Sequence, residues 1–108
     1  MATELWPGVV GEVRNARESV ARVTEAGVRR VLDMQLRQLD YVVEALTDSS
    51  GGLKGGDRQG LEGDLRRLQA RAKSLCQAAQ KGTTTLRPRA WSPTALLEAA
   101  EVASQLPD

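Results

Sequence analysis

The sequence has few of the residues that carry out chemistry. Its 108 residues include no histidine and one cysteine, Cys76. Histidine and cysteine are the commonest zinc ligands and supply most activated nucleophiles, and a lone cysteine cannot form a disulfide within the chain. We therefore expect no metal site, no cofactor and no enzyme activity. Cys76 itself is either a half-buried small apolar residue or a thiol activated by Lys73.

Large apolar residues are scarce as well. Phenylalanine and isoleucine are absent, and two tryptophans and one tyrosine are the only aromatic residues. No uninterrupted apolar run is longer than three residues, so we expect no membrane span. The lone thiol and the lack of an apolar leader favour a reducing compartment, which predicts a cytoplasmic or nuclear location, or both. Trp6 and Trp91 are either core anchors or exposed contact residues.

The net charge of +1 conceals an uneven distribution. Residues 65–97 contain seven basic side chains and no acidic one, whereas residues 1–64 have a net charge of −3 and the last eleven residues another −3. The basic segment could contact phosphate or an acidic protein surface, or it could pack beside the acidic N-terminal helix of its own domain. Because a chain of nearly zero net charge attracts nucleic acid weakly, the sequence does not favour nucleic-acid binding.

Apolar residues recur three or four positions apart along the first half of the chain, which is typical of amphipathic helices. Pro7 suits a helix start, and the two stripes predict helices over about 7–26 and 28–47. Gly27 lies where the register breaks, either as a turn between two helices or as a kink in one long helix. The first stripe comprises Val9, Val10, Val13, Ala16, Val20 and Val23, and the second comprises Val28, Leu32, Leu36, Leu39, Val43 and Leu46.

A glycine-rich segment separates these stripes from a third one. Residues 48–56 contain four glycines and two serines, which predicts a flexible loop. Asp57 could then cap a helix over about 57–81, and Lys81 with Gly82 provides a basic last turn and a stop. The third stripe has the clearest periodicity in the sequence and comprises Leu61, Leu65, Leu68, Ala72, Leu75 and Ala79.

The last part of the chain predicts an extended connector and a short helix. Threonines and then Pro88 disfavour a helix after residue 82, whereas Ser92 followed by Pro93 predicts a helix over about 92–105. Ser92 is either a capping serine or a candidate phosphorylation site, since Arg89 precedes it and a proline follows. The chain therefore divides into a helical bundle, residues 1–82, and a C-terminal part, residues 83–108. Whether the C-terminal helix docks on the bundle is left open.

No segment alternates with the two-residue period of a strand, so the predicted fold class is all-α. We expect a small antiparallel bundle of three or four helices with a short C-terminal helix. Its expected core consists of nine valines and leucines from the three stripes. These are Val13, Val20, Val23, Leu32, Leu39, Leu46, Leu65, Leu68 and Leu75.

The stretch from Val9 to about Gln77 resembles a BAG domain, the three-helix module of a family of co-chaperones. The first stripe is similar to the apolar positions of that family's first helix. The family's third helix opens with Gly-x-Asp-hydrophobic-Arg, which Glu62-Gly63-Asp64-Leu65-Arg66-Arg67 resembles. In the second helix, the residues at comparable offsets are Met34, Leu39, Ala45 and Leu46.

The resemblance implies binding to the ATPase domain of seventy-kilodalton heat-shock chaperones and faster nucleotide release. The family uses two acidic residues ten apart on its second helix, and an arginine and a glutamine eight apart on its third. The acidic positions fall here on Arg37 and on the residue before Asp48. The other two fall on Gln69, with Arg71 nearby, and on Gln77, so Gln77 alone has the family's residue type.

Two functions of different kinds fit these observations. The first is a helical module that binds a partner protein, as a BAG-like adaptor or co-chaperone. The second is a small coiled-coil or helical-bundle subunit of a larger intracellular complex, whose other subunits would bury the stripes. The sequence identifies neither the partner nor the oligomeric state. Under the first hypothesis the candidate partner-binding residues are Asp48, Arg66, Arg67, Arg71 and Gln77, with the three arginines and the glutamine on one exposed face near Asp40, Glu44 or Asp48.

Overall fold

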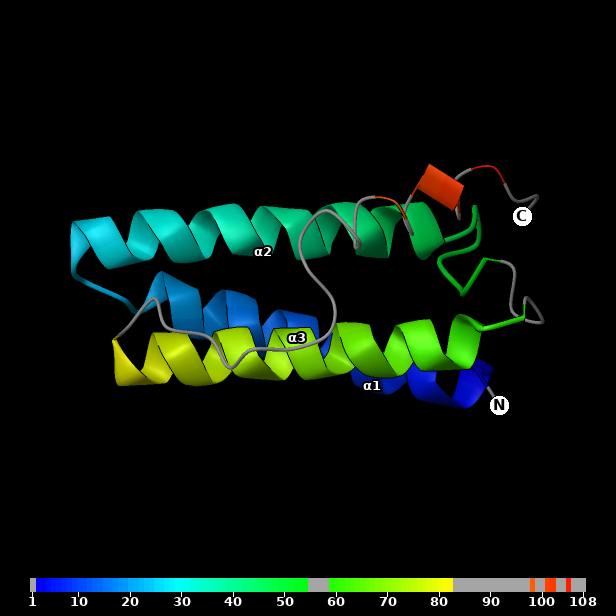
Figure 1. Ribbon diagram of the computed structural model, residues 1–108, viewed down its shortest axis with the longest axis horizontal. Helices are drawn as coiled ribbons and strands as arrows, with labels where there is room; N and C mark the ends of the chain where they lie inside the picture. Colours follow the sequence, from blue (N-terminus) through cyan, green and yellow to red (C-terminus); the bar gives the residue numbers. More distant parts are fainter. Residues whose placement is uncertain (1, 55–58, 83–97, 99–100, 103–104, 106–108) are drawn as a thin grey trace.

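A computed structural model describes residues 2–54, 59–82, 98, 101–102 and 105. Within them the chain forms three helices, α1 (Ala2–Ala21), α2 (Ala26–Leu46) and α3 (Leu61–Lys81), and no strand. The helices lie side by side along the long axis of the molecule, with α1 and α3 running in one direction and α2 in the other (Figure 1). The predicted all-α class is therefore confirmed for the described part of the chain, with three helices rather than four.

The first helix begins earlier than the sequence predicts. It starts at Ala2 and contains Pro7, whereas we expected Pro7 to open it. Proline inside a helix removes one backbone hydrogen bond, here the bond to the Thr3 carbonyl. Trp6 supplies a compensating interaction because its side chain is only 8% exposed and belongs to the core. Tertiary packing of this tryptophan, which is a core anchor, therefore extends the helix.

The break between the first two helices lies before Gly27, not at it. Residues 22–25 connect α1 to α2, and Gly27 is the second residue of α2. Two separate helices are confirmed, and the assignment of Gly27 to the turn is wrong. Glu25 is the N-cap of α2: its carboxylate accepts hydrogen bonds from the backbone N–H of Gly27 (3.0 Å) and of Val28 (2.7 Å). These bonds satisfy two of the donors that a helix start leaves free.

The loop after α2 is more regular than a flexible linker over the residues described. The Asp48 carboxylate accepts hydrogen bonds from the Ser50 N–H (2.9 Å), the Ser50 hydroxyl (2.7 Å) and the Gly52 N–H (2.8 Å). The Lys54 N–H donates to the Leu46 carbonyl at 2.7 Å. Gly51 adopts a positive φ of 88°, which a residue with a side chain rarely adopts. Residues 48–54 therefore form a hydrogen-bonded turn that leads the chain away from α2.

The third helix starts four residues later than predicted and ends where predicted. Gly60, with a φ of 82°, precedes Leu61, so the helix cannot begin before it. Asp57, which we expected to cap this helix, lies outside the described residues. At the other end, Gly82 is the C-cap with a φ of 69°, and its N–H donates to carbonyls of the last turn. The predicted glycine stop is therefore confirmed.

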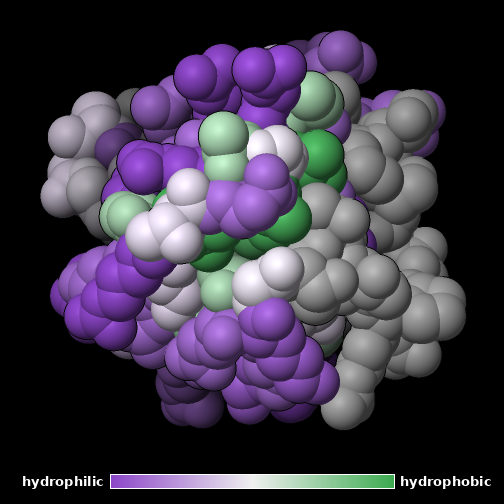
Figure 2. Space-filling view, turned by 90° about the vertical axis from the view of Figure 1, so that its left-hand side faces the viewer, coloured by the Kyte–Doolittle hydropathy of each residue, from purple (hydrophilic) through white to green (hydrophobic). Residues whose placement is uncertain are grey.

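Hydrophilic side chains cover most of the end of the bundle at which α1 passes into α2 and α3 stops. Figure 2 looks onto this end and shows the hydrophobic atoms mainly near its centre, with hydrophilic residues above and below them and at the left. The core thus reaches the surface here over a limited area, with polar side chains beside it. This end matches the ordinary surface of a small bundle, in which scattered apolar exposure is normal.

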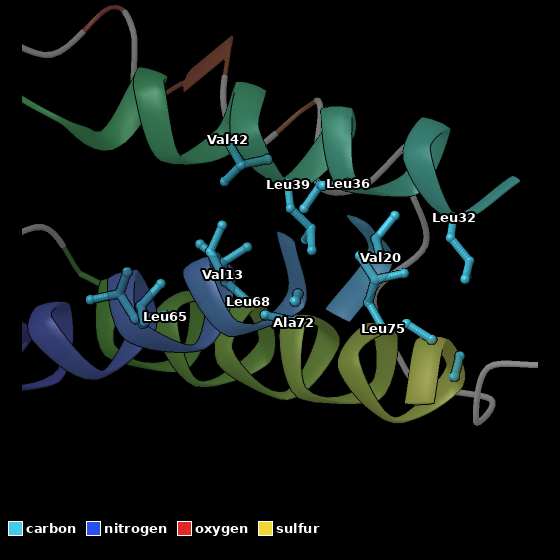
Figure 3. Packing of buried hydrophobic residues seen from close by; sticks show 14 of the residues in the cluster. Val13, Val20, Leu32, Leu36, Leu39, Val42, Leu65, Leu68, Ala72 and Leu75 are labelled. Atoms are coloured by element: carbon cyan, nitrogen blue, oxygen red, sulfur yellow. The ribbon is translucent and has the colours of Figure 1, made fainter. Parts of the chain in front are cut away.

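The core lies between the three helices, and the side chains of α2 point from one side toward α1 and α3 (Figure 3). All nine residues of the expected core are buried. Val10 is a correction to the first stripe, since 39% of it is exposed. Val42, which no stripe included, is fully buried, while Val28 and Val43 are only partly buried. The buried face of α2 is therefore rotated slightly about the helix axis from the predicted face.

Most of the predicted C-terminal part, including the connector, Trp91 and Ser92, lies outside the described residues. Within the predicted helix over 92–105, Glu98, Glu101 and Val102 have helical backbone. The Gln105 N–H donates to the Val102 carbonyl at 3.2 Å, and Val102 is 52% exposed. Those few residues agree with local helical structure. They do not establish a fourth helix of the bundle.

Candidate functional site

Two of the candidate partner-binding residues form ion pairs within α3. Arg66 lies 2.9 Å from Glu62, one turn earlier, and Arg67 lies 3.4 Å from Asp64. The two arginine side chains remain 63% and 55% exposed. Pairs of this kind on a helix surface contribute a few tenths of a kcal/mol and leave the guanidinium groups in water. The hydrogen bond from Arg66 also holds the pKa of the Glu62 carboxyl below its usual value.

The other two candidates on α3 are less accessible. Arg71 and Gln77 are both partly buried, and burial lowers the pKa of the Arg71 guanidinium, which stays charged. Eleven residues, or three helical turns, separate Arg66 from Gln77, which puts them on the same side of α3. Arg67 and Arg71 are four apart and lie along a different side. The four residues therefore do not form one continuous exposed face.

Two of the three acidic side chains expected nearby have other contacts. Asp40 of α2 pairs with Arg17 of α1, so it faces the first helix. The Asp48 carboxylate is occupied by the turn that follows α2, and its hydrogen bonds to Ser50 and Gly52 lower its pKa. Glu44 is exposed on α2. The geometry thus separates the basic residues of α3 from Asp40 and gives Asp48 a structural contact.

Cys76 belongs to the packing between α1 and α3. It is partly buried, and its sulfur lies 3.1 Å from the Ser19 hydroxyl and 3.8 Å from the Asn15 carbonyl oxygen, both of α1. The Gln80 side chain donates to the same sulfur at 3.5 Å. These contacts agree with the interpretation of Cys76 as a half-buried small residue.

Sequence reasoning missed an apolar stripe on the outer side of α2. Five large hydrophobic residues are exposed in the described part of the chain, and three of them, Val31, Met34 and Tyr41, lie on this helix. Their exposed fractions are 38%, 58% and 45%. With partly buried Gln38 and Ala45 they repeat three, four, three and four residues apart, the spacing of a coiled-coil seam. We call Val31, Met34, Gln38, Tyr41 and Ala45 the outer stripe.

The sequence alone did not reveal the outer stripe, because α2 carries two stripes and the core stripe is the more apolar. A glutamine in the middle of the outer stripe interrupts its hydrophobic pattern. The signal that could have revealed it is the heptad spacing of its members, read independently of the core stripe. A helix with apolar residues on two sides can bury one side against its own bundle and the other against a partner.

A hollow of about 360 Å³ borders the outer stripe at Met34. Its other lining residues come from the first half of α2 and are mainly charged: Ala26, Arg29, Arg30, Asp33 and Arg37. A second hollow, of about 270 Å³, lies between α1 and α2. It is lined by Val10, Val13, Arg14, Arg17 and Val43. Both are open depressions on the surface of the bundle, and an apolar side chain of a partner could enter either of them.

Two further features bear on the kind of site. In the described ranges, no helix is both long enough and apolar enough to cross a membrane. Over the same residues, histidine, cysteine, aspartate and glutamate nowhere gather in a group of three or more that could hold a metal ion.

Comparison of the chain with models of known protein families, with curated proteins and with solved structures gives no match.

Proposed function

We propose that this chain is a non-enzymatic helical module that binds a partner protein through the outer stripe of α2. The observation that carries the proposal is the concentration of exposed Val31, Met34 and Tyr41 along one side of a single helix. Scattered exposed hydrophobic residues need no explanation, but a row of them at coiled-coil spacing matches the pattern that another helix buries.

The chemistry of the outer stripe suits a helical partner. Methionine adapts its shape to the surface that it meets, and tyrosine combines a large apolar ring with a hydroxyl that stays hydrated or finds a partner. Arg30 and Arg37 flank Met34 in the hollow described above. The expected partner is therefore an amphipathic helix with its own apolar stripe and with an acidic residue placed to meet Arg30.

Photocrosslinking tests this proposal. The full chain carries the substitution Tyr41→benzoylphenylalanine, is irradiated in the cells that produce it, and is analysed by mass spectrometry. We expect a discrete covalent adduct, because a bound partner holds its side chains within reach of residue 41. The matched control carries the same group at Glu18, which is exposed on α1 away from α2.

The adduct must depend on the apolar surface. Met34→Lys places a charge in the outer stripe and should abolish the adduct at position 41, whereas Ala70→Lys, on the exposed side of α3, should leave it. An adduct that survives Met34→Lys, or equal labelling from positions 18 and 41, would contradict the proposal.

A narrower form of the proposal identifies the partner as the ATPase domain of a seventy-kilodalton heat-shock chaperone. The three-helix arrangement and the position of Gln77 on α3 support it through the resemblance to BAG domains. The measurement is the rate at which labelled nucleotide leaves that domain with and without the full chain. We expect an acceleration that Gln77→Ala reduces and Gln59→Ala, in the exposed turn before α3, leaves unchanged. No acceleration would contradict the co-chaperone function and leave the wider proposal standing.

A further inference from the structure

The outer stripe has a register that allows α2 to pair with a second copy of itself. Its members, together with Gly27, occupy positions 27, 31, 34, 38, 41 and 45. These positions alternate between two sets, one at 27, 34 and 41 and the other at 31, 38 and 45. In an antiparallel pair of such helices, each residue of the first set lies opposite a residue of the second set on the other helix. Val31 then meets Tyr41 of the second copy, and Met34 meets Gln38 of the second copy. The same contacts occur again on the other side of the two-fold axis.

The charges beside the outer stripe favour the antiparallel direction. Arg30 directly precedes Val31 and Glu44 directly precedes Ala45, so the two lie on the same flank of the stripe, fourteen residues apart along the helix. In the register above, Arg30 of each copy lies beside Glu44 of the other, so one interface contains two such pairs. In a parallel pair, Arg30 would lie at the opposite end of the helix pair from Glu44 of the second copy, so no such pair would form. Oppositely charged flanking residues select partner and direction in coiled coils.

The side chains of Arg30 and Glu44 are both free to pair with a second copy of the chain. Arg30 and Glu44 are exposed, and neither forms an ion pair with another residue in the ranges described. By contrast, Arg29 on the same helix pairs with Asp33 at 3.7 Å, and Asp40 pairs with Arg17. Of the α2 charges without an ion pair in the described residues, Arg30 and Glu44 are thus suited to each other across a two-fold axis, whereas Arg37, midway between them, lies beside Arg37 of the second copy.

We propose that this chain forms a homodimer in which the α2 helices of two copies pack antiparallel along the outer stripe, with reciprocal Arg30–Glu44 ion pairs. This inference rests on the proposed function, because it names the partner helix as α2 of a second copy. The same contacts would make the chain the two-fold core of a larger helical assembly.

Charge reversal tests both the dimer and its direction. The full chain is studied by sedimentation equilibrium from low micromolar to millimolar concentrations, together with Arg30→Glu, Glu44→Arg and the double variant. Each single reversal places two like-charged pairs in the interface and should raise the dimer Kd by roughly tenfold. The double variant restores both pairs with their signs exchanged and should dimerise like the original chain. Arg22→Glu, an exposed reversal outside α2, is the matched control.

Mixing the two single variants gives the sharpest result. A heterodimer of Arg30→Glu with Glu44→Arg contains two attractive pairs, so the mixture should dimerise more tightly than either variant alone. No parallel pairing produces this recovery. All of these positions are exposed, and circular dichroism verifies that each variant keeps its helices.

The outcomes separate this inference from the proposed function. A chain that remains monomeric at millimolar concentration, or single variants that dimerise like the original chain, would overturn the homodimer. If the crosslink at position 41 still captures a different protein, the proposed function stands without the dimer. If position 41 gives neither a self-adduct nor another discrete adduct, both fail.

Discussion

At the scale of single residues, two carboxylates mark the ends of α2. Glu25 accepts two backbone N–H bonds at the start of the helix, and Asp48 accepts bonds from Ser50 and Gly52 in the turn after it. Bonds to the backbone of Val28 and Gly27 lower the pKa of Glu25, and bonds from the Ser50 hydroxyl and the Gly52 N–H lower that of Asp48. Each carboxylate therefore stabilises the fold more when it is ionised.

This predicts a loss of stability in acid that can be traced to the two residues. Because the pKa of each is lower in the folded chain, the stabilisation is complete above the unfolded value, about 4 for both side chains, and disappears as the pH falls through the folded values. The double variant Glu25→Gln, Asp48→Asn should melt at a lower temperature at neutral pH. Its melting temperature should also decrease less between about pH 5 and about pH 2 than that of the original chain.

Thermal melting followed by circular dichroism at a series of pH values measures both effects. Glu18→Gln, an exposed carboxylate on α1, is the control and should leave the profile unchanged. A double variant with the same steep acid dependence as the original chain would mean that other groups control it.

At the scale of helices, α1 packs more extensively against α3 than either of them packs against α2. Small buried residues make this close contact between helices possible. Ala16 of α1 and Ala72 of α3 are both fully buried, and Ala78 and Ala79 of α3 are nearly so. A longer side chain at such a position would have to enter space that neighbouring core residues already fill.

Ala16→Leu should therefore destabilise the fold although it adds apolar surface. We expect the free energy of unfolding to decrease by about 1 to 3 kcal/mol, the usual cost of overpacking a core position. Urea denaturation followed by circular dichroism measures the change. Ala21→Leu, the exposed last residue of α1, adds the same atoms in contact with water and should change stability by less than about 0.5 kcal/mol. Equal effects of the two substitutions would show that α1 and α3 have room to move apart.

The sequence predicts the helices and their buried sides well, because the three- and four-residue spacing of leucine and valine is strong along all three. Boundaries depend on contacts that spacing does not encode. Helix α1 extends ahead of Pro7 because Trp6 packs into the core, and the N-cap of α2 is a glutamate, which is not among the preferred N-cap residues. The start of α3 is set in a similar way by local backbone conformation, because Gly60 adopts a positive φ immediately before it.

The candidate site was harder to predict than the fold. Basic residues on α3 were prominent in the sequence because no acidic residue accompanies them after position 65. The fold spreads them around the helix, and Arg71 is partly buried. Val31, Met34 and Tyr41 were inconspicuous because whether an apolar residue is exposed depends on how the helices pack. An exposed apolar row becomes recognisable only when the buried seam of the same helix is known.

At the scale of the whole molecule, the buried residues of the described chain all lie between Trp6 and Ala79. The last of the three helices, α3, ends at Lys81, and Gly82 is its C-cap. The division of the chain after residue 82, which the sequence predicts, stays a prediction. A unit that contains its own core is expected to unfold cooperatively.

A chain that ends at Gly82 should accordingly fold without residues 83–108. We expect it to keep a single cooperative urea transition, with a free energy of unfolding within about 1 kcal/mol of the full chain and a similar dependence on urea concentration. The slope of that dependence is the informative quantity, because it reflects the surface that unfolding exposes. A similar slope would mean that the three helices bury their apolar surface among themselves. A markedly smaller slope, or a broad transition, would show that the segment after Gly82 covers part of the core and belongs to the same cooperative unit. In that case Leu75→Ala, at the end of α3 nearest this segment, should destabilise the full chain more than the shortened one, because only the full chain encloses that side chain completely.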